Sequence, residues 1–170
     1  MSASPRQVSY VTYDRKVLSA RDARERLGKP RSEALVFTNG VFDLVHRGHI
    51  QYLTAARAMG DLLVVGVNSD ASVRSLEKGT GRPFVGQADR AFLVAALECV
   101  DYVCLFDETT PTKLIGELIP DVLVKGSDYD ITEVAGREIV QSNGGRVEVV
   151  PFVKGYSTTE LVRRIRGHQG

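Results

Sequence analysis

The chain has 170 residues, of which 43% are hydrophobic and 25% charged, as in an ordinary globular domain with a sizeable core. Its 22 Lys and Arg residues nearly balance its 21 Asp and Glu residues, so the net charge of +1 gives no reason to expect a nucleic-acid partner. No apolar run approaches the ~18 residues of a membrane span, and the N-terminus lacks the apolar segment of a secretory leader. We therefore expect a cytoplasmic protein that binds neither nucleic acid nor membrane.

Short apolar runs alternate with amphipathic segments along the chain. The apolar runs are continuous, which is typical of parallel strands that helices cover on both faces. We expect strands at Ala34–Thr38, Leu62–Val67, Tyr102–Phe106, Asp121–Lys125 and Val147–Val150. Between and after them we expect helices at Gly48–Met59, Ala71–Leu76, Ala88–Leu97, Pro111–Leu118, Val134–Asn143 and Thr158–Arg166.

This alternation predicts an α/β fold, a Rossmann-like, doubly wound, five-stranded parallel sheet with helices on both faces. We expect the strand order 3-2-1-4-5. Residues 16–170 then form a single domain that begins with a helix at Ser19–Leu27, and residues 1–15 form a flexible N-terminal segment.

Two helix starts carry recognisable residues. Thr110 and Pro111 have the form of an N-cap followed by proline in the first turn. Ser157 and Glu160 have the S-x-x-E spacing of a capping box, ahead of an apolar helix face.

Two cysteines, Cys99 and Cys104, lie in apolar surroundings without C-x-x-C spacing. We interpret them as reduced core residues, and a disulfide or a zinc pair is the weaker alternative.

Polar residues gather where the expected strands end. In a doubly wound sheet, ligands bind outside the carboxyl ends of the strands, near the point where the strand order reverses. The polar segments that follow the strands are residues 39–49, 68–70, 125–129 and 155–159. Their expected convergence predicts one binding site at this edge of the sheet.

Residues 38–49 read TNGVFDLVHRGH, with His46 and His49 three residues apart. Zinc pairs on helices usually take i,i+4 spacing with an intervening Glu, and the remaining histidine is His168 in the tail, so zinc is disfavoured. Helix capping or packing would explain either histidine alone. Phosphate binding explains the pair, because Gly40 allows close backbone approach and the following helix aims its N-terminal amides at the same place.

Residues 76–90 form a glycine-rich basic loop that contains Lys78, Arg82 and Arg90. Such a loop is commonly a solvated surface segment, but after the second strand it could also close over a polyphosphate as a lid. The chain has neither a Walker A sequence nor a G-x-S-x-G nucleophile elbow. Direct displacement at phosphorus, with catalysis by positioning and charge neutralisation, is the chemistry most compatible with these segments.

The motif His46-Arg47-Gly48-His49 resembles the H-x-G-H signature of the nucleotidyltransferase superfamily, and residues 157–159 (STT) resemble its second signature. Together with VNSDASV, GRP, KGSDY and GYSTTELVRRI, the string TNGVFDLVHRGHIQYL is similar to the adenylyltransferases of ADP-heptose synthesis. The similarity runs from about residue 16 to residue 166. It implies transfer of AMP from ATP to D-glycero-β-D-manno-heptose 1-phosphate, which yields ADP-heptose and pyrophosphate for the inner core of lipopolysaccharide.

The resemblance also implies roles for individual residues. The catalytic residues would be His46, His49 and Lys78. The nucleotide would be bound by Thr38, Asn39, Gly40, Phe42, Gly48, Lys125, Gly126, Tyr129, Ser157, Thr158 and Thr159, and the sugar phosphate by Asp43, Asn68, Asp70, Arg82 and Arg90. Mg²⁺ is implied as the counter-ion of the ATP phosphates, without a metal site of the protein's own.

Three departures bear on this resemblance. In many bacteria the activity is the second domain of a bifunctional heptose kinase/adenylyltransferase; no kinase sequence is attached here, so we expect a stand-alone transferase. Ser127 replaces a glycine that is common in the family. Residues 154–156 (KGY) differ from the Arg-Thr-Glu-Gly-Ile typical of cytidylyltransferases of alcohol phosphates.

The expected partners are ATP and a sugar 1-phosphate, together with a second copy of the chain, since a homo-oligomer, with a dimer favoured, is a family-level expectation. A cytidylyltransferase acting on glycerol 3-phosphate or a similar alcohol phosphate is the nearest alternative function. A non-catalytic nucleotide sensor is a third hypothesis, which the intact histidine pair and STT motif disfavour.

Overall fold

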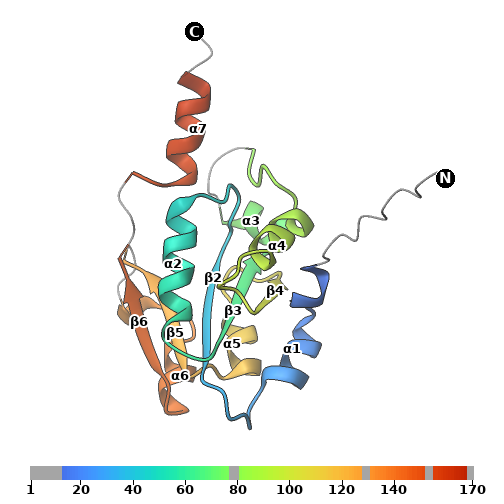
Figure 1. Cartoon of the computed structure of the whole chain (residues 1–170), viewed down its shortest axis with the longest axis vertical. Helices are drawn as coiled ribbons and strands as arrows, with labels where there is room; N and C mark the ends of the chain where they lie inside the picture. Colours follow the sequence, from blue (N-terminus) through green and yellow to red (C-terminus); the bar gives the residue numbers. More distant parts are fainter. Residues whose placement is uncertain (1–12, 77–80, 128–130, 152–154, 168–170) are drawn as a thin grey trace, which may run out of the picture.

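The computed structural model describes residues 13–76, 81–127, 131–151 and 155–167, which fold into one parallel sheet between two layers of helices (Figure 1). The strands are β1 (Val17–Leu18), β2 (Leu35–Gly40), β3 (Leu62–Asn68), β4 (Tyr102–Phe106), β5 (Val122–Gly126) and β6 (Arg146–Val150). The α-helices are α1 (Ala20–Leu27), α2 (Arg47–Arg57), α3 (Asp70–Ser75), α4 (Gln87–Ala95), α5 (Thr112–Leu118), α6 (Arg137–Ser142) and α7 (Thr158–Gly167). Two short 3-10 helices, Tyr13–Lys16 and Ile131–Glu133, complete the described elements.

In the described part of the chain, the strands lie in the order β1-β4-β3-β2-β5-β6, and every pairing is parallel. The expected strands correspond to β2 through β6, so the doubly wound class and the order 3-2-1-4-5 are confirmed. The predicted number of strands is wrong by one, because Val17–Leu18 pairs with β4 and extends the sheet. A two-residue strand is too short to show any periodicity, so the sequence pattern could not reveal it.

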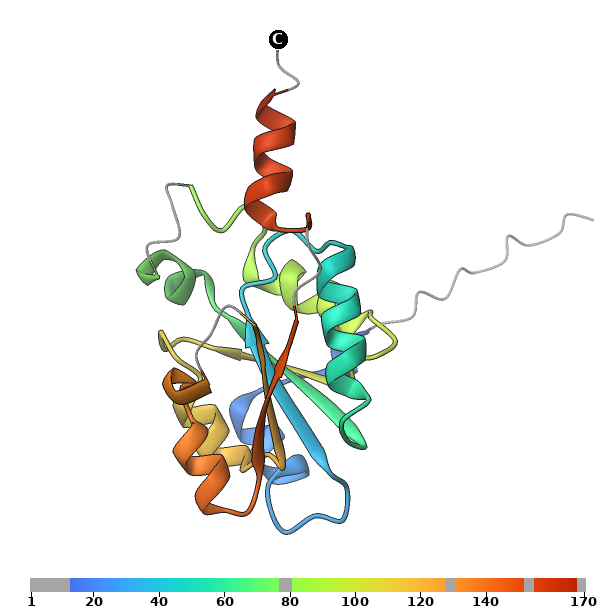
Figure 2. The ribbon, with the colours of Figure 1, turned by 90° about the vertical axis from the view of Figure 1, so that its left-hand side faces the viewer.

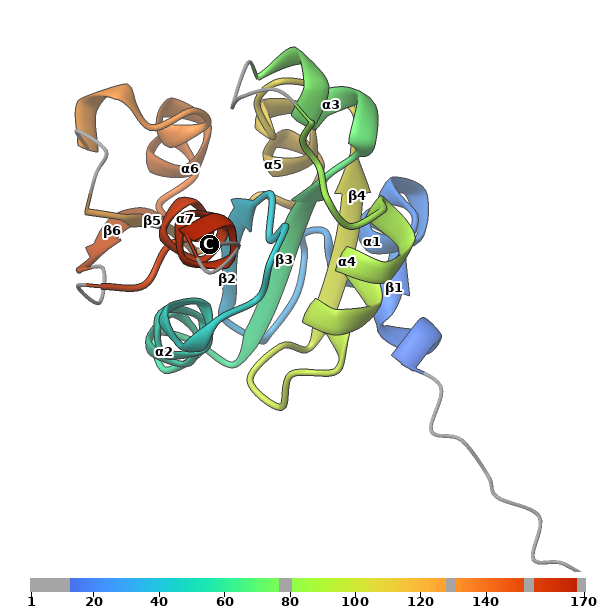
Figure 3. The same ribbon diagram turned by 90° about the horizontal axis from the view of Figure 1, so that it is seen from above.

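Helices cover both faces of the sheet, as Figure 3 shows from above. Helices α2 and α4 pack with Leu63, Val65 and Val67 in one apolar cluster, whereas α1, α5 and α6 pack with Val64 in the other. Neighbouring residues of a single strand are thus buried on opposite faces. This arrangement explains why the strands are apolar throughout and do not alternate with polar residues.

Of the expected capping box at Ser157 and Glu160, the hydroxyl half forms, while the Glu160 carboxylate accepts from Arg163 and Arg164. The Ser157 hydroxyl accepts a hydrogen bond from the Glu160 N–H at 3.1 Å and caps α7. The predicted N-cap at Thr110 is wrong, because Pro111 itself occupies the N-cap position of α5. The Thr110 hydroxyl is instead engaged with the Thr112 hydroxyl at 3.1 Å.

The expected domain boundary falls near the first described residues. Residues 1–12 of the expected N-terminal segment lie outside the described residues. Tyr13, which begins the first 3-10 helix, packs its ring edge-on against Phe92 of α4, with ring centroids 5.6 Å apart. The expected N-terminal helix is present as α1, and the Ser19 hydroxyl caps it by accepting from the Asp22 N–H.

The cysteines Cys99 and Cys104 are both free, as expected. Cys104 is fully buried, and burial raises the pKa of its thiol to about 12, so the thiol stays protonated. None of the helices in the described ranges is long and apolar enough to cross a bilayer.

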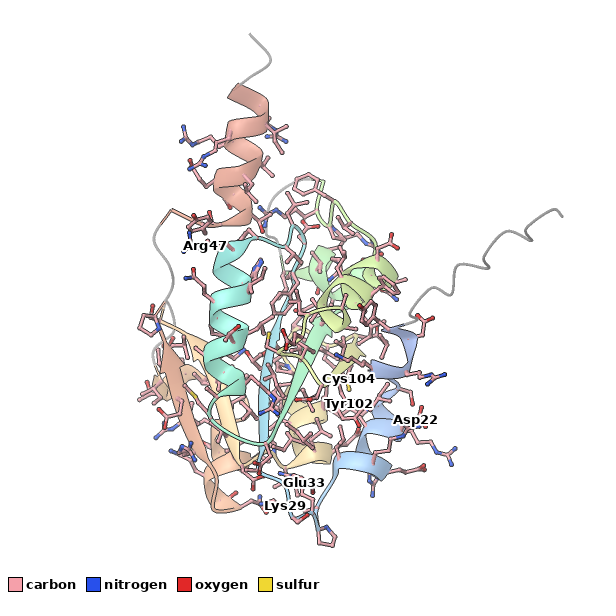
Figure 4. All side chains as sticks on the ribbon, viewed as in Figure 1. Asp22, Lys29, Glu33, Arg47, Tyr102 and Cys104 are labelled. Carbon is pink, nitrogen blue, oxygen red and sulfur yellow. The ribbon has the colours of Figure 1, made fainter. Side chains whose placement is uncertain are left out.

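The buried Arg31 side chain joins several segments by hydrogen bonds at the end of the sheet opposite the carboxyl ends of the strands. The Arg31 guanidinium donates to the carbonyls of Leu27, Leu118 and Ile119 and to the Asp121 carboxylate, at 2.6 to 3.0 Å. Its side chain is only 6% exposed. Lys29 and Glu33, its near neighbours in sequence, lie at the opposite end of the molecule from Arg47 and α7 (Figure 4).

We predict that Arg31→Lys lowers the free energy of unfolding by about 1–3 kcal/mol, because a lysine cannot satisfy all of these acceptors and leaves buried carbonyls without donors. Urea denaturation measures this loss. Arg21→Lys is the control, since Arg21 is exposed and paired within its own helix, and it should shift stability by less than about 0.5 kcal/mol. Equal stability of the two variants would contradict the role of Arg31.

Candidate functional site

A cavity of about 200 Å³ lies at the carboxyl ends of β2 and β5, beside the first turns of α2 and α7. Figure 2 shows α7 rising from this end of the molecule. The cavity is lined by Asn39, Gly40, Val41, Phe42, Asp43, His49, Tyr52, Arg82, Lys125, Gly126 and Thr158. The fold thus brings together parts of the chain that are more than 100 residues apart in sequence, Asn39 and Thr158 among them.

The turn after β2 is shaped by its glycine and by a strained phenylalanine. A Cβ at Gly40 would lie 3.0 Å from the Phe42 ring, so a larger residue would crowd that ring. Phe42 has a positive φ of 51°, which is uncommon for a non-glycine residue. Its buried ring tilts against His49, with centroids 5.1 Å apart, and so fixes the wall of the cavity.

The two histidines of the H-x-G-H motif stack on each other at the start of α2. Their ring centroids are 3.8 Å apart, and the ring planes differ by 13°. His46 is the N-cap residue, and its Nδ1 accepts a hydrogen bond from the His49 backbone N–H at 3.3 Å. A Cβ at Gly48 would lie 3.1 Å from the His46 ring and 3.0 Å from Tyr156, so the glycine leaves room for this arrangement. Capping and site formation are therefore combined in one motif.

Both imidazoles are uncharged near neutral pH. Burial, and secondarily the neighbouring His46, lower the pKa of His49 to about 4. Burial also lowers the pKa of His46. Because the His46 Nδ1 is an acceptor, its neutral ring carries the hydrogen on Nε2. The described residues include no group of three or more His, Cys, Asp and Glu side chains that could hold a metal ion.

Two cationic side chains from other parts of the chain line the cavity. Lys125, at the end of β5, is only 6% exposed, and its ammonium donates to the Asn39 side-chain oxygen. Arg82, in the loop before α4, also lines the cavity and reaches the Thr159 hydroxyl of α7 at 3.4 Å. These cations, together with the N-termini of α2 and α7, make the cavity suited to an anionic ligand.

Several predicted site residues have structural roles in which their side chains are already engaged. The Thr38 hydroxyl is fully buried and shares a hydrogen bond of 2.7 Å with Tyr52. The Asn68 amide, also buried, donates to Ser72. Neither side chain lines the cavity, so ligand binding by these two residues stays a prediction.

Arg90 and Asp70 are likewise engaged with each other. The Arg90 side chain is fully buried and forms an ion pair with Asp70 at 2.8 Å. Both residues were expected to bind the sugar phosphate, but neither lines the cavity.

The remaining predicted residues fall into three groups. Asn39, Gly40, Phe42, Asp43, His49, Arg82, Lys125, Gly126 and Thr158 line the cavity. His46, Gly48, Ser157 and Thr159 lie immediately beside it, through the contacts already described. Lys78 and Tyr129 lie outside the described residues, so their roles stay predictions.

Sequence reasoning missed Tyr52. It lines the cavity, and its hydroxyl connects Thr38 of β2 to the Val124 carbonyl of β5. The sequence held a signal for it, because Tyr52 follows His49 by three residues and therefore shares its helix face.

Two solved structures are similar to this chain. A lipopolysaccharide core biosynthesis protein from Thermoplasma volcanium is 32% identical in sequence and superposes with a TM-score of 0.61, over 74% of this chain and 100% of that one. A pantothenate synthetase from Thermus thermophilus has a TM-score of 0.56 at 20% identity, over 91% of this chain and 76% of that one, which shows a shared fold alone.

Closer sequence relatives are longer proteins. Bifunctional protein HldE of Geotalea uraniireducens is 58% identical over 151 residues, which are 89% of this chain and 31% of that protein. HldE of Campylobacter concisus is 49% identical over 92% of this chain and 32% of that protein. The chain thus spans about a third of the length of these relatives.

The family model described as cytidylyltransferase-like matches residues 37–164, which run from β2 to the second half of α7 and include the whole cavity. The chain belongs to the cytidylyltransferase-like family.

Proposed function

We propose that this chain is a nucleotidyltransferase that transfers AMP from ATP to D-glycero-β-D-manno-heptose 1-phosphate, with ADP-heptose and pyrophosphate as products. The observation that carries the proposal is the gathering of a neutral histidine, two cations and the start of α7 around one cavity. The description of the Thermoplasma relative as a lipopolysaccharide core biosynthesis protein supports the sugar substrate. The bifunctional relatives agree with an activity that elsewhere forms one domain of a two-function protein.

In this reaction an oxygen of the sugar phosphate attacks the α-phosphorus of ATP. The bond from that phosphorus to the bridging oxygen breaks, and its electron pair leaves with pyrophosphate. No residue of the protein needs to form a covalent bond, so the chain contributes positioning and charge stabilisation. Mg²⁺ arrives on the ATP phosphates, as an ion of the substrate.

The histidines act as hydrogen-bond donors to the phosphates. His46 donates through Nε2, since its Nδ1 is occupied, and His49 donates from a ring that is uncharged in the free protein. A nearby triphosphate raises the pKa of both rings, because an anion favours the charged imidazolium. Positive character thus increases where negative charge collects in the transition state.

Other residues around the cavity bind the phosphate groups. The hydroxyls and first-turn amides at residues 157–159 hold the β- and γ-phosphates, and Arg82 lies over them. Lys125 supplies charge at the end of β5. Catalysis by Lys78, a cytoplasmic location and a homodimer stay predictions.

A crossed assay tests the substrates. Pyrophosphate release is measured with ATP or CTP, each combined with heptose 1-phosphate or glycerol 3-phosphate. We expect activity with ATP and heptose 1-phosphate. Activity confined to CTP and glycerol 3-phosphate would replace the proposal by a cytidylyltransferase of alcohol phosphates, and silence in all four mixtures would favour a nucleotide sensor.

His49→Ala should lower kcat by roughly 10²-fold or more without unfolding the protein, because it removes a donor that stabilises charge in the transition state. Steady-state kinetics and thermal melting measure the two effects separately. Ile50→Ala is the matched control, since Ile50 is the next residue of α2 and its side chain is exposed. Unchanged turnover of His49→Ala with a lower melting temperature would show that this histidine only packs.

The uncharged state of His49 predicts a pH dependence of stability. An unfolded histidine has a pKa near 6.5, and His49 in the fold has a pKa of about 4. Between these values the unfolded chain binds more protons, so the free energy of unfolding falls as the pH is lowered from about 6.5 toward 4. His49→Gln should make this fall smaller, which urea denaturation across that pH range measures. An identical fall in both proteins would show that His49 is not the titrating group.

A further inference from the structure

The loop that carries Arg82 has almost no apolar anchorage of its own. Residues 81–86 include no buried residue, and the Phe84 side chain is 45% exposed. The Arg82 guanidinium lies over the Phe84 ring, 5.8 Å from its centroid. Hydrogen bonds must therefore decide where this loop, and with it Arg82, sits relative to the cavity.

Asp43 supplies the first of these bonds. Its Oδ1 accepts from the backbone N–H groups of Phe84 and Val85, at 2.7 and 3.0 Å. The Asp43 side chain belongs to the turn that leads into the H-x-G-H motif, and the residue is only 2% exposed. Its other oxygen, Oδ2, is buried without a hydrogen-bond partner among the described residues.

Arg90 supplies a second link between the same two segments. Its Nε donates to the Val85 carbonyl at 2.9 Å, and its Nη1 donates to the Val41 carbonyl at 2.6 Å. Its Nη2 donates to the Asn68 carbonyl and to Asp70. The rigid fork of a fully buried guanidinium thereby joins the loop, the turn after β2 and the end of β3.

The Asp43 and Arg90 side chains link the loop and the turn from two different parts of the chain. Asp43 reaches from the turn to the loop's N–H groups, whereas Arg90 reaches from α4 to carbonyls of both the loop and the turn. Val85 is held at both its N–H and its carbonyl, three residues after Arg82. From this fixed point the loop extends to Thr159, which Arg82 meets at 3.4 Å.

We propose that Asp43 and Arg90 are positioning residues that clamp residues 84–85 onto the turn at 41–43 and thereby set Arg82 at the side of the cavity next to the start of α7. The proposal rests on the proposed function in one respect, that Arg82 contacts a polyphosphate. Arg90 then acts through Arg82, whereas the family resemblance implies that it binds the sugar phosphate.

A double-mutant cycle tests this clamp, with the binding of inorganic tripolyphosphate measured by calorimetry. Arg82→Ala should weaken binding about 10-fold, and Asp43→Ala or Arg90→Lys about 5-fold, in the otherwise unchanged protein. In the Arg82→Ala background the same clamp substitutions should change binding by less than about 2-fold, because they act through Arg82. Full additivity, with the clamp substitutions equally costly in both backgrounds, would overturn the proposal.

Arg31→Lys is the matched control, since Arg31 is also a buried arginine that joins backbone carbonyls, but at the other end of the sheet. It should lower stability without changing tripolyphosphate affinity or coupling to Arg82. Amide hydrogen exchange gives a second readout: Phe84 and Val85 should exchange faster in Asp43→Ala and at the wild-type rate in Arg31→Lys. Unchanged protection in Asp43→Ala would contradict the clamp.

Asp43→Asn separates positioning from direct contact with substrate. Its amide oxygen can still accept from Phe84 and Val85, so affinity should recover to within about 2-fold of wild type. Loss of affinity in Asp43→Asn with both amides still protected would show instead that Asp43 acts other than by holding these two amides, and would overturn its role in the clamp. Tripolyphosphate lacks both base and sugar, so coupling in this cycle can hold even if the crossed substrate assay fails, and the two failures remain distinguishable.

Discussion

Parallel hydrogen bonding between β2 and its neighbours β3 and β5 makes these strands end at the same edge of the sheet. Each strand must then be followed by a polar segment, because its last residues leave the region that the helices cover. The crossovers that contain α2 and α4 cover one face and those that contain α5 and α6 cover the other, so the strand order reverses at β2. The turn after β2 is therefore the one from which H-x-G-H enters a cavity shared with β5 and α7.

Buried arginines lie at both ends of this sheet, and at one end two further cations line the cavity. At the end opposite the cavity, the Arg31 guanidinium donates to carbonyls and a carboxylate. At the cavity end, the Arg90 guanidinium does the same. Buried guanidinium groups of this kind hold segments of the chain together. Arg82 and Lys125 face the cavity, where they can meet an anion. The neutral histidines complete this arrangement, because they add donors to the cavity without adding fixed charge to the free protein.

Helix α7 joins the site by its first turn. It has no buried residue, and Ile165 in its last turns is 61% exposed. Figures 1 and 2 show it projecting from the end of the molecule that contains the cavity. Its capping hydroxyl at Ser157 is committed to the Glu160 N–H, whereas Thr158 faces the cavity and Thr159 meets Arg82. Helix capping and lining of the cavity thus fall to different neighbouring hydroxyls, which the S-x-x-E pattern alone does not reveal.

The fold class, the order of five strands and the edge at which the cavity forms could be predicted from the sequence, because apolar runs, helix periodicity and turn residues are local signals. The sequence could not reveal β1, whose two residues become a strand only by pairing with β4. Tertiary structure alone decided the charge state of His49, since its pKa depends on burial and on the stacked His46 ring. The partners of Arg90 are also set by the tertiary structure, because the groups that this guanidinium binds belong to segments from 5 to 49 residues away, which only the folded sheet brings within its reach.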